Sequence, residues 1–197
     1  MDTAEALNEQ VIALVWALSG LSPSRGVAPV EVERYSVKCG GTAMANQFSS
    51  LRRIINEAIR GIIVNDSVLI KKGQEWALSN KLGMYLFRCF PGWDVDCEYN
   101  RTGFEDELKR TANGKYKRPD IIIHKRGYPE RENNLLWIEV KIDNDDTTGD
   151  VDKLREFTSA PMGDRTIQYQ YGLSISFVPG VRLVWIENGA QRTIETP

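Results

Sequence analysis

The stretch Arg118–Ile142, RPDIIIHKRGYPERENNLLWIEVKI, reads as two apolar strands joined by a charged connection that contains proline and glycine. Both strands carry charge: Asp120 stands at the start of the first, and Glu139 and Lys141 stand near the end of the second. Residues two apart share a face of a strand, so Glu139 and Lys141 point the same way. Apolar residues line both faces, which is typical of a central, covered strand. A charge there is costly unless it is paired or bound to a metal.

A metal ion would explain these charges. A tight antiparallel arrangement of the two strands brings Asp120 beside Glu139, where two carboxylates repel each other and force one to stay protonated. A hard divalent cation removes that conflict, because carboxylate, carbonyl and water oxygens are the ligands that Mg²⁺ prefers. Lys141 then adds positive charge where a phosphate oxygen or an activated water would sit. The stretch therefore predicts a site for Mg²⁺ or Mn²⁺.

The elements around this stretch predict an α/β domain from residue 75 to residue 197. Hydrophobic patterns indicate the order α-β-β-β-α-β and then a last strand. The expected helices are 75–90 and 150–158, the second capped by Asp150, and the expected strands are 94–101, 118–126, 134–142, 167–178 and 181–189.

Residues 1–74 are expected to form a small, mainly helical module. Helices are predicted over 4–21, 29–39 and 44–61, followed by a hairpin over 62–70 around Asn65-Asp66-Ser67. Residues 51–78, LRRIINEAIRGIIVNDSVLIKKGQEWAL, resemble a winged-helix module whose wing is this hairpin. The alternative is a helical appendage that packs against protein instead of reading DNA.

Pro119-Asp120 and Glu139-Val140-Lys141, on successive strands, resemble the motif of the PD-(D/E)xK nuclease superfamily. The resemblance covers roughly residues 75–185 and implies a restriction-endonuclease-like mixed sheet flanked by helices. It also implies divalent-metal-dependent hydrolysis of a phosphodiester. By the motif match, Asp120, Glu139 and the Val140 carbonyl would be metal ligands, and Lys141 would orient or activate the attacking water.

The sequence departs from the pattern in one respect. Many members of the superfamily place a further glutamate on the helix before the first strand, where this chain offers Asn80, and Glu75 stands earlier. Asn80 can still accept a hydrogen bond from a metal-bound water but adds no charge. Glu98 is a further candidate ligand, with a solvent-facing strand residue as the alternative reading.

Other residues are accessory candidates. His124 lies on the same strand face as Asp120 and could contact a phosphate, although a structural role is the expected one. Gln168 is expected to approach the site from a later strand or to be a surface residue. Four basic residues are expected contacts for a nucleic-acid backbone, with a solvated surface as the alternative: Arg101, Lys125, Arg126 and Lys153.

Composition excludes several classes of protein. The 197 residues carry a formal net charge of −2, and basic residues gather only locally, between Arg101 and Arg131. His124 is the only histidine, so zinc sites of the HExxH kind are impossible. No P-loop or GxGxxG motif occurs. Three cysteines without a CxxC pair, an apolar run too short to span a bilayer and an acidic flank predict a cytoplasmic protein with no membrane partner.

The sequence therefore predicts a Mg²⁺-dependent nuclease that acts on nucleic acid, with DNA as the expected substrate, in bacterial or phage DNA processing or defence. A catalytically silent nuclease fold that binds nucleic acid or regulates is the first alternative. An interaction protein whose basic stretch binds an acidic partner is the second. Restriction-like folds often cut both strands as dimers, so a homodimer is a further expectation.

Overall fold

A computed structural model describes residues 43–103, 107–143, 147–163 and 167–196 of the chain. These residues belong to a compact unit that spans residues 34–197. The helices predicted over 4–21 and 29–39 lie outside the described residues.

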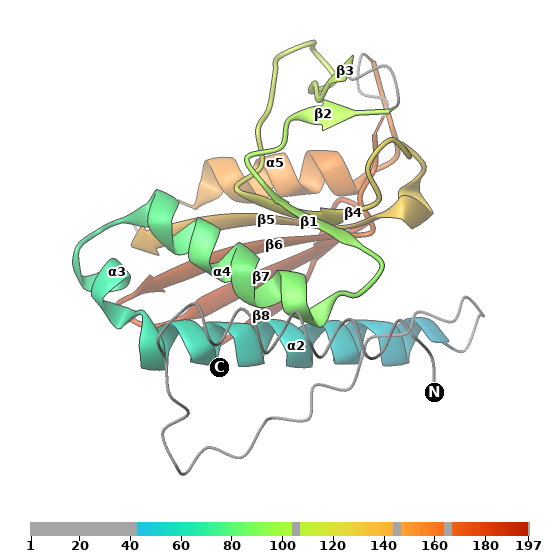
Figure 1. Cartoon of the computed structure of the whole chain (residues 1–197). Helices are drawn as coiled ribbons and strands as arrows, with labels where there is room; N and C mark the ends of the chain where they lie inside the picture. The colour runs from blue at the N-terminus through green and yellow to red at the C-terminus, as the bar shows by residue number, and fades with distance from the viewer. Residues whose placement is uncertain (1–42, 104–106, 144–146, 164–166, 197) are drawn as a thin grey trace. The chain divides into compact units, whose positions relative to one another are not determined.

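The centre of this unit is a mixed sheet in the order β1-β4-β5-β6-β7-β8 (Figure 1). Its strands are β1 (Asp94–Cys97), β4 (Ile121–His124), β5 (Asn134–Asp143), β6 (Tyr171–Val178), β7 (Arg182–Glu187) and β8 (Ala190–Glu195). β5 and β6 are parallel, and every other neighbouring pair in this sheet is antiparallel. Parallel neighbours need a crossover connection, and α5 (Thr148–Thr158) supplies it. The predicted α/β class with a mixed sheet is confirmed.

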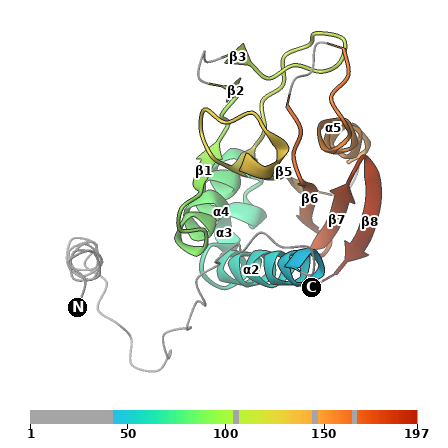
Figure 2. The same ribbon diagram turned by 90° about the vertical axis from the view of Figure 1, so that its right-hand side faces the viewer.

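Helices cover both faces of the sheet, α5 on one and α2 (Ala43–Asn65) with α4 (Glu75–Cys89) on the other (Figure 2). The strand alternation explains the two layers. Ile121 and Ile123 of β4 join the core formed with α2 and α4, whereas Ile122 joins the core formed with α5. Residues along most of β5 and β6 are buried on both faces, as expected for the centre of a covered sheet.

The predicted hairpin over residues 62–70 is wrong. Helix α2 continues to Asn65, and a short helix, α3 (Ser67–Lys71), follows. Ile62 is fully buried on the inner face of α2, and the Asp66 carboxylate accepts a hydrogen bond from the Tyr85 hydroxyl at 3.1 Å. These contacts with the rest of the core outweigh the β propensity of the two short apolar runs. The described residues therefore have no wing at 62–70, the feature on which the winged-helix resemblance depended.

Several predicted boundaries also move. β1 ends at Cys97 because Glu98 adopts a left-handed backbone conformation with φ of 54°. β6 begins at Tyr171, four residues later than predicted. Asp150 lies in the first turn of α5 and is not its N-cap, because the helix begins at Thr148. Strand β8 and the small sheet of β2 (Arg101–Thr102) and β3 (Glu107–Leu108) were not predicted.

Candidate functional site

The structure brings Asp120 next to the Glu139-Val140 pair. Antiparallel pairing sets Ile121 against Ile138, so Asp120, one residue before β4, falls beside Glu139. The Asp120 Oδ2 atom accepts a hydrogen bond from the Val140 backbone N–H at 2.7 Å. The N–H and C=O of one residue in a strand point to the same edge, so the Val140 carbonyl also faces the side where β4 has ended.

Glu139 is a buried carboxylate, only 3% exposed. The Trp137 indole N–H donates to its Oε1 atom, and the Lys153 ammonium lies 2.6 Å from its Oε2 atom. The pKa of Glu139 is raised to about 7, mainly by burial and also by the neighbouring Asp120, while Lys153 opposes the rise. Glu139 therefore lies at the edge of ionisation near neutral pH even with a lysine beside it.

Two lysines stand among the acids. Lys141 Nζ lies 3.1 Å from Glu75 Oε1 and 3.9 Å from Asp150 Oδ2. Burial lowers the pKa of Lys141, but the hydrogen bond to Glu75 and the charge of Asp150 outweigh this, and its pKa ends above the usual value. Lys153 bridges the Glu139 carboxylate and Asp150 Oδ1, 3.4 Å away. These contacts define a carboxylate–lysine cluster made of Glu75, Asp120, Glu139, Lys141, Asp150 and Lys153.

Burial and neighbouring negative charges disfavour the ionised form of Asp120. Its pKa is raised, mainly by burial and also by the charges of Glu75 and Asp150, while the Val140 N–H and Lys153 oppose the rise. The two ammonium groups therefore leave the negative charge only partly compensated. Such a site favours a further positive charge.

Glu75 and Asp150 are the members of the cluster that the sequence reasoning did not assign to it. Glu75 opens α4, and its side chain reaches Lys141 across 66 positions in sequence. The signal was the start of the helix: a residue in the first turn of α4 faces β5, whereas Asn80 donates its amide N–H to the Trp76 carbonyl of its own helix at 2.9 Å. The sequence predicts Asp150 as the cap of α5. No local pattern indicates that the crossover from β5 to β6 brings its carboxylate toward Lys141.

A small cavity adjoins the cluster. It has a volume of about 90 Å³ and is lined by Glu75, Trp76, Ser79, Glu98 and Asp120. Because β1 ends before it, Glu98 turns toward Asp120: its backbone N–H donates to the Asp120 carbonyl at 3.0 Å, and its carboxylate lies 3.3 Å from Arg118. The cavity thus presents three carboxylate side chains to a space large enough for a few waters.

The donor set fits a hard cation. Every candidate ligand around Asp120 offers oxygen, as Mg²⁺ or Mn²⁺ requires. The buried Asp150 Oδ2 atom has no hydrogen-bond partner among the described residues, and such an atom calls for a water or a cation. Within the same part of the chain, no three acidic, cysteine or histidine side chains already converge at metal-binding distance. Lysine ammonium groups stand between the acids instead.

No protein-family model, curated protein or solved structure matches this chain. The case for its function therefore depends on the arrangement of its own residues. Among those that the structure describes, no helix is both long enough and apolar enough to cross a membrane.

The other predicted residues lie away from the cluster. His124 is buried, and its Nε2 atom lies 2.9 Å from Asp96 Oδ2, so it has the structural role that was expected. Arg126 pairs with the same Asp96 carboxylate through two hydrogen bonds. Gln168 donates to the Thr158 carbonyl at the end of α5 at 2.9 Å.

The basic candidates differ in their surroundings. Lys125 lies over the Trp93 ring, with its Nζ atom 5.4 Å from the ring centre. Arg101 is exposed on β2. Only Lys153 joins the cluster, where it contacts carboxylates.

The insertion between β1 and β4 is anchored by a buried lysine. Lys109 is 1% exposed, donates from Nζ to the carbonyls of Tyr99 and Arg101, and lies 4.7 Å from the centre of the Tyr99 ring. Burial lowers the pKa of Lys109 to about 7, and the charge of Asp96 only partly opposes this. A neutral amine keeps two N–H groups and can still donate to both carbonyls.

Lys109 should make stability depend on pH. Its pKa is about 7 in the folded protein against 10.5 for an ordinary lysine, so in this window the unfolded chain binds more protons. The free energy of unfolding is therefore expected to rise with pH across it, by about 1.4 kcal/mol per unit of the pKa difference at most. The measurement is urea unfolding of the wild type and of Lys109→Met across this window. A difference between the two proteins that does not change with pH would contradict the assignment, and Lys72→Met, at an exposed lysine, is the matched control.

Proposed function

We propose that this protein is a divalent-metal-dependent nuclease that hydrolyses phosphodiester bonds in nucleic acid, with DNA as the expected substrate. The observation that carries the proposal is the convergence of Asp120, Glu139 and Lys141, from two neighbouring strands, with Glu75 completing the group from the preceding helix. The pKa values of Asp120 and Glu139 are raised even with two lysines in the cluster, so a doubly charged cation would stabilise the ionised carboxylates.

The order of the elements supports the same proposal. Apart from the small β2–β3 sheet, the chain order of the helices and strands from α4 to β6 is α-β-β-β-α-β, formed by α4, β1, β4, β5, α5 and β6. β5 and β6 are parallel across the α5 crossover. This is the order that the resemblance to the PD-(D/E)xK superfamily implies, and a restriction-endonuclease-like fold is the finer assignment that we propose.

Each residue has a distinct part in the proposed reaction. The carboxylates of Asp120 and Glu139, with the Val140 carbonyl, would hold the cation, and the Val140 N–H keeps Asp120 oriented toward it. Lys141, held by Glu75, would orient the attacking water and meet a phosphate oxygen. A bound Mg²⁺ would supply an activated water and offset charge at phosphorus. Lys153 would release Glu139 when the cation arrives, because both compete for the same carboxylate.

The direct test is a cleavage assay with purified protein. Labelled DNA and RNA are incubated with Mg²⁺ or Mn²⁺, and a parallel reaction contains EDTA. Cleavage that requires the metal is expected, and it should stop on chelation and return when the metal is restored. Intact substrates under all metal conditions, with folded protein, would reject the proposal.

A catalytically silent nuclease fold that binds nucleic acid is the second candidate. The observation that favours it is that both lysines already pair with carboxylates of the cluster and that no three acids of the described residues converge at metal-binding distance. Titration calorimetry separates the two candidates. A silent fold binds nucleic acid but gives no heat with Mg²⁺ that depends on Asp120 and Glu139.

A further inference from the structure

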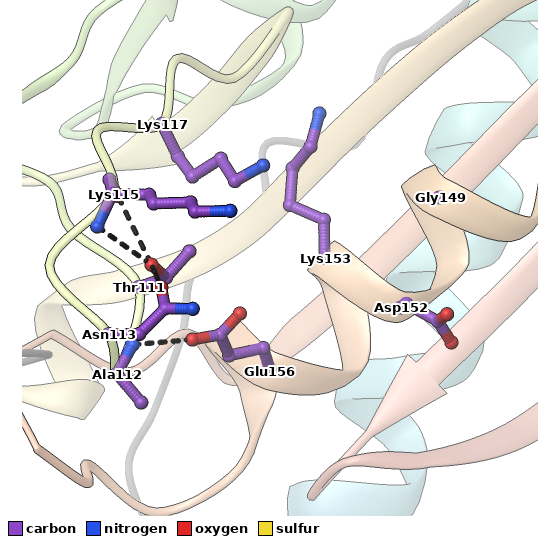
Figure 3. Close-up of a pocket in the computed structure, with 9 residues that line it drawn as sticks. All are labelled: Thr111, Ala112, Asn113, Lys115, Lys117, Gly149, Asp152, Lys153 and Glu156. Carbon is purple, nitrogen blue, oxygen red and sulfur yellow. Dashed lines mark hydrogen bonds between the residues drawn. The ribbon is translucent and has the colours of Figure 1, made fainter.

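A second, larger cavity lies beside the carboxylate–lysine cluster. It has a volume of about 430 Å³ and lies between α5 and the turn at residues 111–117, within the insertion that separates β1 from β4. Three of its lining residues are lysines, Lys115, Lys117 and Lys153 (Figure 3). The side chains of Lys115 and Lys117 extend from the turn toward Lys153 on the helix.

The wall that carries Lys115 and Lys117 is fixed by its backbone. The Ala112 N–H donates to Glu156 Oε1 at 2.6 Å and ties the turn to α5. Within the turn, the Thr111 N–H donates to the Lys115 carbonyl at 2.9 Å, and the Lys115 N–H donates to the Thr111 hydroxyl at 3.0 Å. None of these bonds uses a lysine side chain. The amines can therefore be removed without dismantling the wall.

The cavity has an excess of positive charge that is free to meet an anion. Its three lysines outnumber its two acids: Asp152 pairs with Arg155 at 3.1 Å, and Glu156 accepts a hydrogen bond from the Ala112 N–H of the same cavity wall. Within the part of the chain that the structure describes, neither Lys115 nor Lys117 forms a salt bridge. Two unpaired ammonium groups facing one open space favour a phosphate or a similar anion.

Lys153 connects this cavity to the cluster. Its stem lines the cavity, and its Nζ atom lies 2.6 Å from Glu139 Oε2. The cavity and the cluster therefore share Lys153, so a nucleic-acid strand with one phosphate at the cluster would have a neighbouring phosphate to offer to the cavity. Contacts of this kind position the backbone and are independent of base sequence.

We propose that the lysine-lined cavity binds a backbone phosphate of the substrate next to the one that is cleaved. This inference rests on the proposed function, since it assigns a subsite of the same reaction. Lys115 and Lys117 bind the phosphate, and Lys153 would join them if a bound cation took its place beside Glu139. The insertion between β1 and β4 then acts as the wall that guides the strand into the site.

The test is DNA binding in EDTA, where no cleavage occurs. Fluorescence anisotropy with a short labelled DNA compares the wild type, Lys115→Ala/Lys117→Ala and the control Lys71→Ala/Lys72→Ala, which removes two exposed lysines of α3 and its C-cap. The cavity variant is expected to bind about tenfold more weakly, and its slope of log affinity against log salt should shrink by about 0.7 to 0.9, for one phosphate that is no longer neutralised. The control should match the wild type.

The outcomes are distinguishable. Equal binding by the cavity and control variants would overturn the subsite, whatever the cleavage assay gives. Weaker binding by the cavity variant alone supports the subsite even if the wild type fails to cleave, a result that rejects only the proposed reaction. Pyrophosphate serves as a competitor: displacement of DNA from the wild type but not from the cavity variant is expected. Pyrophosphate binding without any DNA binding would overturn the backbone assignment in favour of a small phosphate ligand.

Discussion

Asp120→Asn protein should lose metal-dependent cleavage by about 10²- to 10³-fold or more, a loss typical of removing one group that stabilises charge in an active site. The asparagine oxygen can still accept the hydrogen bond that the Val140 N–H gives to Asp120 Oδ2. The substitution therefore removes the charge that would hold the cation while it keeps the local geometry. Single-turnover cleavage at saturating enzyme isolates this loss from any change in substrate binding.

Two controls sharpen this prediction. Glu57→Gln removes an exposed carboxylate of α2 that pairs with Arg60 at 2.8 Å and does not belong to the cluster. The Glu57→Gln protein should therefore cleave as the wild type does. Circular dichroism and thermal unfolding should show the Asp120→Asn protein folded. Wild-type cleavage by a folded Asp120→Asn protein would remove Asp120 from the site.

Lys153→Met is expected to lower the free energy of unfolding by about 1.4 kcal/mol near pH 8 in the absence of metal. A buried carboxyl without its counter-charge takes up a proton, which costs about 1.4 kcal/mol for each pH unit above the wild-type Glu139 pKa of about 7. Lys153 Nζ is 2.6 Å from Glu139 Oε2, and only 4% of the Glu139 side chain is exposed. Methionine preserves most of the packing volume of the lysine stem. Urea unfolding followed by tryptophan fluorescence measures the loss.

The pH dependence of this loss in the free energy of unfolding identifies Glu139 as its cause. Glu139 has a pKa raised to about 7 by burial, against 4.5 for an ordinary glutamate, and removal of Lys153 raises it further. A carboxyl group with a raised pKa binds more protons in the folded state, so stability falls as pH rises from about 4.5 through the folded value. The variant should therefore differ least from the wild type at acid pH and most at alkaline pH. Glu139→Gln in the Lys153→Met background should restore most of the stability.

Added Mg²⁺ extends the same experiment. A cation held by Glu139 and Asp120 replaces the lost ammonium, so Mg²⁺ should stabilise Lys153→Met more than it stabilises the wild type. Lys71→Met, at an exposed lysine, should change stability by less than about 0.5 kcal/mol and should respond to Mg²⁺ as the wild type does. Equal responses of all three proteins to Mg²⁺ would contradict a cation at this carboxylate.

The sequence was informative where a pattern had one physical meaning. Glu139 and Lys141 interrupt an apolar strand, and only a paired or ligating role tolerates charge there; the structure pairs both residues. Leu78, Leu82 and Leu86 repeat every four residues and form the inner face of α4, within the helix predicted over 75–90. Asp120 follows a proline at the mouth of a strand and lies beside Glu139, as the antiparallel register requires.

The sequence was less informative where long-range contacts decided the outcome. Ile62 and its neighbours have β propensity, but burial against the core keeps them helical. Glu75 and Asp150 reach the cluster because of where their helices begin and how they cross the sheet, and neither property follows from local spacing. Glu98 ends its strand because it adopts a left-handed backbone conformation, which the sequence does not indicate since no glycine or asparagine stands at this position.

The cluster draws its members from two helices, from β5 and from the residue before β4, and its contact between Glu75 and Lys141 closes a loop of 66 residues. Contacts this distant along the chain form late, since closing a long loop costs entropy before any stabilisation is gained. Recovery of the proposed metal-dependent cleavage during refolding should consequently lag behind the return of the far-ultraviolet dichroism signal. The return of cleavage would then mark the last step of folding, in which the contact between Glu75 and Lys141 forms.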